Sequence, residues 1–387
     1  MFLDDLPTPC LLIEKRRLDE NLRLMQEMAD SQRVFLRPHV KTHKSLAIAR
    51  SQLELGARGI TVAKVGEAER FVEGGFEDVR IAYTVIGEEK YARISDLMDR
   101  ARVSFCIDTR EGAHAASAFF AAGGRRMDVL LEVNVGYNRC GVDPSEKGSI
   151  ELAADIDSMP GLRLVGILTH AGHSYAGPEE GESHEEALRR ISNRERDAML
   201  EFAARLGKAG VADSNSFEVS IGSTPSMRYF ENTETGGFRI TEIRPGNYVF
   251  NDGIQLALRV AELHSCALTV LTTVVSRHRD HAGKERLFLD AGKKILTSDT
   301  GYKTDGYGIL LYNARTMQPM PHAHITNLSE EHGWVDVLGG STLSVGDRVR
   351  VVPNHACVAV NTQDLMYVVD GEDVVDSLPV DARGRVI

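Results

Sequence analysis

The chain has 387 residues, which is too long for a single ordinary core and suits a barrel accompanied by a smaller domain. Its formal net charge of -11 and the lack of a useful basic run exclude a nucleic-acid partner. No apolar stretch approaches the roughly 18 residues of a membrane span. Met1–Asp5 lacks the layout of a signal peptide, and five scattered cysteines suit a reducing compartment. We therefore expect a cytoplasmic protein with no membrane partner.

Up to about residue 250, short apolar runs alternate with amphipathic stretches. A strand is expected at residues 8–14, and a helix follows in which Leu18, Leu22, Met25 and Met28 recur at helical spacing. Later helices are predicted at residues 67–73, 90–100, 111–122 and 185–207. Eight further strands are predicted at residues 33–37, 58–63, 79–83, 103–107, 128–133, 162–168, 216–221 and 239–243.

This alternation predicts an α/β fold with a parallel sheet, and eight such units fit a (β/α)8 TIM-type barrel. An open doubly wound sheet is the competing architecture, but no Gly-rich dinucleotide turn follows the first strand. From about Asn251 the pattern changes to β-type runs at residues 265–276, 286–290, 333–337, 346–352 and 365–370. We therefore predict a barrel over residues 9–250 and a C-terminal all-β domain over residues 251–387, with residues 1–8. Whether the first strand crosses over to pair with the β-domain stays open.

The stretch Arg37–Lys44 follows the first barrel strand. Pro38 should force an extended exit, which places Lys41 just beyond the strand's carboxyl end, where barrels carry their chemistry. Neighbouring cationic side chains, or burial, would lower the pKa of the Lys41 amine and make it a nucleophile toward carbonyls. A basic surface turn is the alternative, and this stretch alone favours it.

Three later strands are followed by loops with binding or proton-transfer groups. Arg139 lies in the glycine- and asparagine-rich loop 134–142 and could donate paired hydrogen bonds to an anion or phenolate; an exposed turn is equally consistent. Residues 220–226 and 244–248 follow the seventh and eighth strands, where barrels commonly bind phosphate. In loop 169–175, at least one of three residues should act directly on protons or bind a carboxylate: His170, His173 and Tyr175.

His355 and Cys357 lie two positions apart in the β-domain. On a strand they would share a face, and one imidazole with one thiolate could hold a divalent ion with open positions. Thiolate favours zinc, whereas manganese and magnesium prefer oxygen ligands. A purely structural pair is the alternative.

Together these pieces resemble the D-threonine aldolase and D-serine dehydratase family of fold-type III pyridoxal-phosphate enzymes. The matching pieces run in the family's order and span nearly the whole chain: Arg37–Lys41, Gly136–Gly141, Ser220–Ser226, Arg244–Tyr248, Asp290–Gly292, Glu331–Gly333 and His355–Cys357. The resemblance implies an alanine racemase-like barrel with a C-terminal β-domain, working as a homodimer. It also implies pyridoxal 5'-phosphate and a divalent metal: zinc or manganese, with magnesium as a further option.

The resemblance also assigns roles to individual residues. Lys41 looks like the Schiff-base lysine, Arg139 would lie near the cofactor's phenolic oxygen, and Arg244 would face the pyridine nitrogen. His355 and Cys357 match the metal ligands, although many of the aldolases carry an aspartate where Cys357 stands. The phosphate would be held in the two later loops, by Gly222, Ser223, Thr224, Gly246, Asn247 and Tyr248.

The activity implied is a lyase that cleaves β-hydroxy-D-amino acids such as D-threonine to glycine and an aldehyde. A D-serine or 3-hydroxy-D-aspartate dehydratase, which releases a keto acid and ammonia, is the main alternative. An amino-acid racemase would need no metal. A non-catalytic pyridoxal-phosphate carrier would lack the β-domain, so residues 251–387 argue against it.

Overall fold

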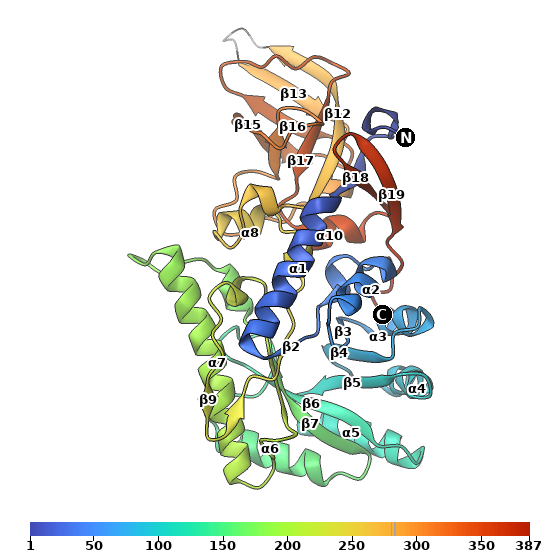
Figure 1. The fold of residues 1–387 in the computed structure, drawn as a ribbon, viewed down its shortest axis with the longest axis vertical. Helices are drawn as coiled ribbons and strands as arrows, with labels where there is room; N and C mark the ends of the chain where they lie inside the picture. The colour runs from blue at the N-terminus through green and yellow to red at the C-terminus, as the bar shows by residue number, and fades with distance from the viewer. Residues whose placement is uncertain (280, 282–283) are drawn as a thin grey trace.

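A computed structural model describes residues 1–279, 281 and 284–387. It contains an eight-stranded and a nine-stranded β-sheet, one above the other in the view of Figure 1, and a two-stranded hairpin. Helix α1 (Lys15–Gln32) runs beside both parts (Figure 1). None of the helices in the described ranges combines the length and apolar composition that a membrane crossing requires.

The eight-stranded sheet is parallel throughout and forms the predicted barrel. An isolated parallel bridge between His39 and Thr61 joins its two edge strands, so the sheet curls on itself. All eight barrel strands were predicted, with ends displaced by a few residues. In sheet order they are β2 (Phe35–Leu36), β11 (Glu242–Ile243), β8 (Glu218–Ile221), β7 (Leu162–Thr169), β6 (Met127–Val133), β5 (Arg102–Ile107), β4 (Asp78–Thr84) and β3 (Ile60–Val62).

Helices follow most of the barrel strands. The longest begins with a capping box in which Ser183 and Glu186 satisfy each other's backbone amides, at 3.2 and 2.9 Å. The helix at residues 147–158 was not predicted, because its first turn carries Gly148 and Ser149. The outer helices are α2 (Leu46–Glu54), α3 (Val65–Glu73), α4 (Glu88–Leu97), α5 (Arg110–Ala122), α6 (Lys147–Ser158) and α7 (His184–Lys208).

The nine-stranded sheet is antiparallel except where β1 pairs with β18. An additional β12–β13 pairing closes six of its strands into a small barrel. Because β1 lies between β12 and β18, the first strand does cross over, while the division near residue 250 stays a prediction. In sheet order the strands are β13 (Glu285–Leu289), β16 (Gly333–Val337), β15 (Pro319–Leu328), β14 (Ile309–Leu311), β17 (Arg348–Val352), β12 (Leu268–Arg279), β1 (Cys10–Glu14), β18 (Leu365–Asp370) and β19 (Asp373–Pro379).

The sequence patterns did not predict β14, β15 and β19. β15 carries two prolines, Pro319 and Pro321, which normally argue against a paired strand. The remaining elements are short: β9 (Glu234–Thr235), β10 (Phe238–Arg239), α8 (Gly253–Ala257), α9 (Lys293–Leu296), α10 (Ala356–Asn361), and the 3-10 turns η1 (Leu3–Asp5), η2 (Val40–Thr42), η3 (Gly172–Tyr175), η4 (Pro225–Met227), η5 (Asn247–Val249) and η6 (Leu263–Ser265).

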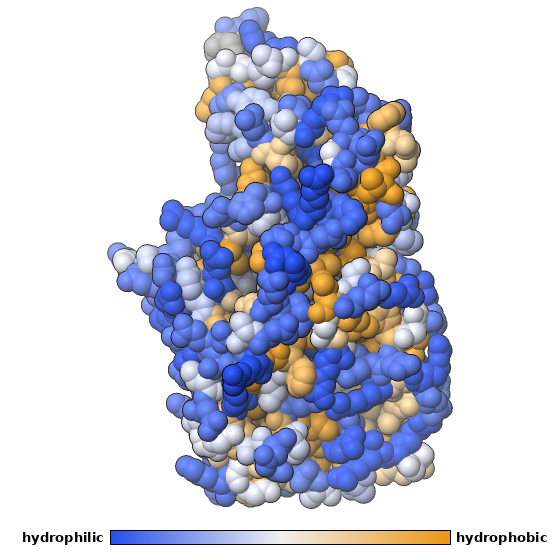
Figure 2. All heavy atoms as spheres, in the orientation of Figure 1, coloured by the Kyte–Doolittle hydropathy of each residue, from blue (hydrophilic) through white to orange (hydrophobic). Residues whose placement is uncertain are grey.

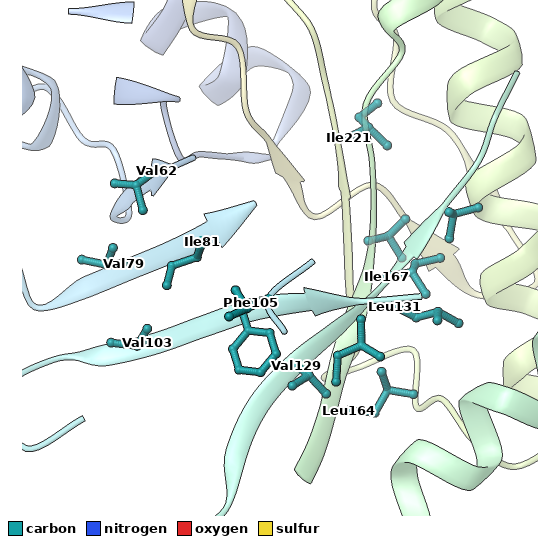
Figure 3. Packing of buried hydrophobic residues seen from close by; sticks show 14 of the residues in the cluster. Val62, Val79, Ile81, Val103, Phe105, Val129, Leu131, Leu164, Ile167 and Ile221 are labelled. Carbon is teal, nitrogen blue, oxygen red and sulfur yellow. The ribbon is translucent and has the colours of Figure 1, made fainter. Parts of the chain in front are cut away.

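The barrel strands alternate between apolar residues that face the helices and polar residues that face the interior. Val79 and Ile81 on β4 belong to the large apolar cluster between sheet and helices, shown in Figure 3. Arg80, between them, points the other way and forms ion pairs with Glu218 and Glu242, on strands that are not its neighbours. These contacts must cross the barrel interior, which is therefore filled with charged side chains. Hydrophilic residues cover most of the outer face seen in Figure 2.

Candidate active site

A cavity of about 780 Å³ lies at the carboxyl ends of the barrel strands, where the barrel faces the nine-stranded sheet. Residues from both parts line it, so neither part forms it alone. Twelve of the fourteen candidate residues named from the sequence line the cavity: Lys41, Arg139, His170, Tyr175, Gly222, Ser223, Thr224, Arg244, Gly246, Asn247, His355 and Cys357. The other two are His173 and Tyr248; Tyr248 is buried, and its hydroxyl accepts a hydrogen bond from Gln52 Nε2 at 2.9 Å.

Lys41 lies in the one-turn helix η2 that follows β2. Burial lowers the pKa of its amine, and the charges of Arg139 and Arg244 lower it further, although Cys357 and Glu67 act in the opposite direction. The sequence suggested that cationic neighbours in the chain would lower the pKa of Lys41, but Arg37 and Lys44 do not. Arg37 turns into the barrel to bind Asp78 and Glu242, and Lys44 pairs with Glu67 at 3.1 Å. The cavity wall, not the local sequence, therefore favours the neutral amine.

The loops after β8 and β11 form a cradle in which several backbone amides have no hydrogen-bond acceptor within the described protein. Gly222 has φ +130°, and a side chain on Gly246 would meet the His39 carbonyl oxygen at 2.9 Å, so glycine allows both loops to pack closely. In the described part of the chain, the backbone amides of Thr224, Gly246 and Asn247 donate to no protein acceptor. Free amides from two adjoining loops suit a phosphate group, so this cradle fits the phosphate of pyridoxal phosphate.

Arg244 is a buried residue that lines the cavity, and hydrogen bonds to the protein hold its guanidinium group in place. Its Nε donates to Ser220 Oγ at 2.7 Å, and Ser220 Oγ donates to Glu242 Oε1 at 2.7 Å. A second guanidinium nitrogen of Arg244 donates to the carbonyl oxygen of Thr169. This arrangement fixes the guanidinium plane against the cavity.

Arg139 is more loosely held, since 53% of its side chain is exposed and it lies 3.8 Å from Glu132 Oε1. Glu132 also accepts a hydrogen bond from Cys140 Sγ at 2.9 Å. Burial raises the pKa of the Glu132 carboxyl against the lowering effects of Cys140 and Arg139. Arg139 is therefore able to turn toward an anionic group in the cavity.

Of the three candidates in loop 169–175, His170 and Tyr175 line the cavity and His173 does not. Burial, reinforced by Lys41, lowers the pKa of His170 to about 3, so the ring is neutral near pH 7. Its Nδ1 lies 3.3 Å from the carbonyl oxygen of Gly222, which places the proton on Nδ1 and leaves Nε2 as an acceptor. Burial raises the pKa of the Tyr175 phenol, which therefore stays a proton donor.

His355 and Cys357 do not lie on a strand, so that expectation is wrong. His355 caps the start of α10 and Cys357 lies in its first turn, because Pro353 ends β17 and the chain turns there. The two side chains still meet at the cavity wall. Cys357 Sγ lies 3.3 Å from the Thr42 hydroxyl, beside Lys41, and His355 Nδ1 lies 2.7 Å from Asp299 Oδ2.

The electrostatics of this pair suit a cation. Burial alone would lower the pKa of His355, but Cys357, Asp252 and Asp299 together raise it to about 10. Burial would raise the pKa of Cys357, yet His355 and Thr42 bring it below its ordinary value. A thiolate beside a histidine whose other nitrogen is oriented by a carboxylate fits a zinc-type site. Among the described residues no group of three or more such ligands occurs, so water or substrate would complete the coordination.

Sequence reasoning missed several cavity residues: His39, Lys64, Glu132, Asp252, Gln255 and Asp299. Asp252 and Asp299 stand before glycine or hydroxyl residues in turn-like stretches, which is the only local signal they carry.

Comparisons with known proteins agree with this geometry. Residues 13–252 match the family described as "Alanine racemase, N-terminal domain", and residues 267–369 match the "Putative serine dehydratase domain". D-threonine aldolase from Arthrobacter sp. is 32% identical over 97% of this chain and 93% of its own length. D-threo-3-hydroxyaspartate dehydratase from Delftia sp. is 32% identical over 91% of each chain.

Solved structures of the same group of enzymes match this chain over nearly its whole length. The Delftia sp. dehydratase superposes with a TM-score of 0.86 at 30% identity, covering 98% of each chain. Two further structures of an enzyme of that name match with TM-scores of 0.87. One is a cysteine-to-alanine variant in the metal-free form, and the other is a variant in which the histidine two positions before that cysteine is alanine.

Proposed function

The chain belongs to the alanine racemase-like, fold-type III pyridoxal-phosphate family that includes the D-threonine aldolases and D-serine dehydratases, and on that premise we propose a metal-dependent lyase that cleaves β-hydroxy-D-amino acids by a retro-aldol reaction. The homologues are lyases, which establishes the lyase class for this chain. The proposal is the carbon–carbon cleavage. It is supported by one observation: Cys357 Sγ lies 3.3 Å from the hydroxyl of Thr42, the residue after Lys41, so a cation held at Cys357 and the amine of Lys41 would meet the same substrate.

The residues present fit both groups that the family uses. When bound, pyridoxal phosphate supplies an aldehyde that links to an amine and a ring that accepts electrons from a bond broken at Cα. The loops around Gly222 and Gly246 would hold its phosphate, Arg244 would face the ring nitrogen, and Arg139 would reach the phenolic oxygen. His355 and Cys357 would hold the metal, which supplies a Lewis acid for the β-hydroxyl.

The chain's own groups can move the protons that cleavage requires. We propose that His170 accepts the hydroxyl proton at Nε2, since that nitrogen carries no proton when Nδ1 faces Gly222. Tyr175, held in its protonated form by burial, lines the cavity and would deliver a proton to Cα, and Lys41, which lines the same cavity, would do so once its amine has taken up a proton.

Product analysis tests the proposal. Purified protein loaded with pyridoxal phosphate and Mn²⁺ or Zn²⁺ is incubated with D-threonine and D-serine, with and without a chelator. The expected result is glycine and acetaldehyde from D-threonine, lost on chelation and restored by metal. Activity that survives chelation would contradict the metal, and the absence of glycine would contradict the cleavage.

Dehydration is the second candidate, because one specific observation favours it. Cys357 follows His355 by two positions, and a dehydratase with matching structure has a cysteine two positions after a histidine, both of them substituted in the variants described above. Ammonia and a keto acid from D-serine or 3-hydroxy-D-aspartate, without glycine, would assign this reaction instead. The expected homodimer is tested on the same sample by light scattering, where a mass near 42.6 kDa would contradict it.

A further inference from the structure

The phosphate cradle and the turn that carries His355 and Cys357 are joined by backbone hydrogen bonds. Two amides that follow the cradle loop donate to the two carbonyl oxygens that precede His355, each at 3.0 Å: Gly253 to Pro353, and Ile254 to Asn354. The end of the cradle segment and the start of this turn are therefore paired directly, although they lie far apart in the chain. A displacement of one segment is transmitted to the other.

Asn247 takes part in both sites. Its backbone amide is one of the cradle amides that donate to no acceptor within the described protein. Its side-chain Nδ2 donates to Asp252 Oδ2 at 2.6 Å and to Cys357 Sγ at 3.7 Å. Its Oδ1 is buried and has no hydrogen-bond partner among the described residues, so Nδ2 alone holds the side chain. An anion bound at the backbone of Asn247 would therefore also fix the amide group that contacts the thiolate.

Asp252 connects Asn247 to the turn that carries the two candidate metal ligands. It is completely buried, and the same Oδ2 that accepts from Asn247 also accepts from the backbone amide of Ala356 at 2.9 Å. Ala356 stands between the two candidate ligands in the chain. Oδ1 accepts from the Gln255 amide at 3.1 Å, which anchors the carboxylate at the start of α8. One carboxylate oxygen is thus shared by the cradle and the turn.

These shared contacts predict that the two sites assist each other. A group bound at the cradle orders Asn247 and, through Asp252, the turn around Ala356 before a cation arrives. Binding of the cation then costs less conformational entropy, and the same holds in the opposite direction. The two affinities change by the same factor, because a coupling free energy is reciprocal.

We propose that Asn247 and Asp252 are positioning residues that couple the phosphate cradle to the cation site at His355 and Cys357, so that occupancy of either site strengthens binding at the other. This inference rests on the two binding sites of the proposed function and not on the reaction, so it holds for cleavage and for dehydration alike. Attraction through space between a phosphate and a cation has the same sign. Since the Asn247 side chain is uncharged, it can be removed without altering that attraction.

The test measures the Zn²⁺ affinity of the full-length protein, freed of cofactor and metal, with and without pyridoxine 5'-phosphate. This compound keeps the ring and the phosphate of the cofactor, but an alcohol replaces the aldehyde, so it does not link to Lys41. A chelator buffers free Zn²⁺, and the probe is saturating for each protein. The coupling factor is the ratio of the two Zn²⁺ dissociation constants.

Four variants are compared with wild type: Asn247→Ala, Asp252→Ala, Asp252→Asn and the control Asn232→Ala. The Asn232 side chain also joins two segments, since its Nδ2 donates to the carbonyl oxygens of Gln32 at 3.2 Å and Ile240 at 3.0 Å. It does not line the cavity. The control therefore removes a bridging amide of the same kind away from both sites.

In wild type, pyridoxine 5'-phosphate should tighten Zn²⁺ binding about 10-fold. Asn247→Ala and Asp252→Ala should reduce the coupling factor below about twofold, whereas Asn232→Ala should leave it at about 10-fold. Asp252→Asn should retain most of the coupling, because its carbonyl oxygen still accepts from Asn247 and Ala356 although the charge is lost. An unchanged coupling factor in Asn247→Ala would overturn the inference, since only attraction through space would then join the sites.

The outcome is independent of the lyase reaction. A wild-type coupling factor below about twofold would overturn the inference even if D-threonine is cleaved. A factor of about 10 that is lost in Asn247→Ala, in a protein that releases no glycine, would support the coupling while the proposed cleavage fails.

Discussion

The interior of the barrel and the carboxyl ends of its strands differ in whether their charged side chains have partners within the protein. Inside the barrel, Arg37 and Arg80 each form an ion pair with Glu242 and another with a further acid, and these three side chains are almost completely buried. At the carboxyl ends of the barrel strands, Lys41 and Lys64 have no carboxylate partner in the described structure. The first set completes its hydrogen bonds within the protein, whereas the second leaves them for a ligand.

The paired charges of the interior therefore serve stability, whereas the unpaired groups at the cavity serve function. Breaking a buried ion pair leaves an uncompensated charge and costs stability, whereas removing an unpaired cavity group costs stability little and removes chemistry. The link between the ends is Ser220, whose hydroxyl joins Glu242 below to Arg244 above. The predictions below test this contrast, from the largest effect to the smallest.

Lys41→Ala should lower kcat about 1,000-fold or more, because it removes both the amine that links to the aldehyde and a proton carrier. The unfolding free energy of the apoprotein should not fall comparably, since burial already disfavours the charged amine. Steady-state kinetics and urea unfolding measure the two quantities. A variant that keeps about a tenth of the activity would remove Lys41 from the chemistry.

Glu242→Gln should lower the unfolding free energy by about 3–5 kcal/mol, because Arg37 and Arg80 would lose their shared carboxylate in the barrel interior. Urea denaturation gives the value. Glu89→Gln is the matched control: it removes an ion pair with Arg93 in which the glutamate side chain is 79% exposed, and no measurable change is expected. Equal effects of the two substitutions would refute the contrast between interior and surface.

Asp299→Asn should weaken metal affinity about 10- to 100-fold, because Asp299 orients the His355 ring through the 2.7 Å contact at Nδ1. Titration of the apoprotein with Zn²⁺ or Mn²⁺ measures the change. Asp305 makes a similar 2.6 Å contact with His324 Nδ1 outside the cavity, so Asp305→Asn should leave the affinity unaltered. A loss in both variants would point to a general charge effect.

Burial of His43 should make the stability of the folded protein depend on pH. Desolvation lowers its pKa from 6.5 to about 3, so between these values the unfolded chain binds a proton that the folded protein does not. Stability should therefore fall by about 1.4 kcal/mol per pH unit below pH 6.5 from this residue. His43→Gln should reduce that slope in urea unfolding between pH 7 and about 5, whereas His264→Gln, an exposed site, should not. An unchanged slope in His43→Gln would show that the ring is protonated when folded.

Local sequence patterns predicted the barrel because each strand and helix is indicated by residues that are close together in the chain. Apolar runs such as 128–133 and 162–168 alternate with helical periodicity, and a parallel sheet follows from that alternation. β15 was missed since two prolines oppose its strand character, and only pairing with β14 and β16 forms it. The pair His355 and Cys357 was found through its residue types, although its position in a strand was wrong.

The sequence by itself determined which residue types were available, namely a lysine after a strand, glycine-rich loops and a histidine–cysteine pair. Only the tertiary structure decided which of them act together. Burial that lowers the pKa of Lys41, the partnerless amine of Lys64 and the support of His355 by Asp299 all depend on groups far apart in the chain. Electrostatics and desolvation act through space, so no local pattern encodes them.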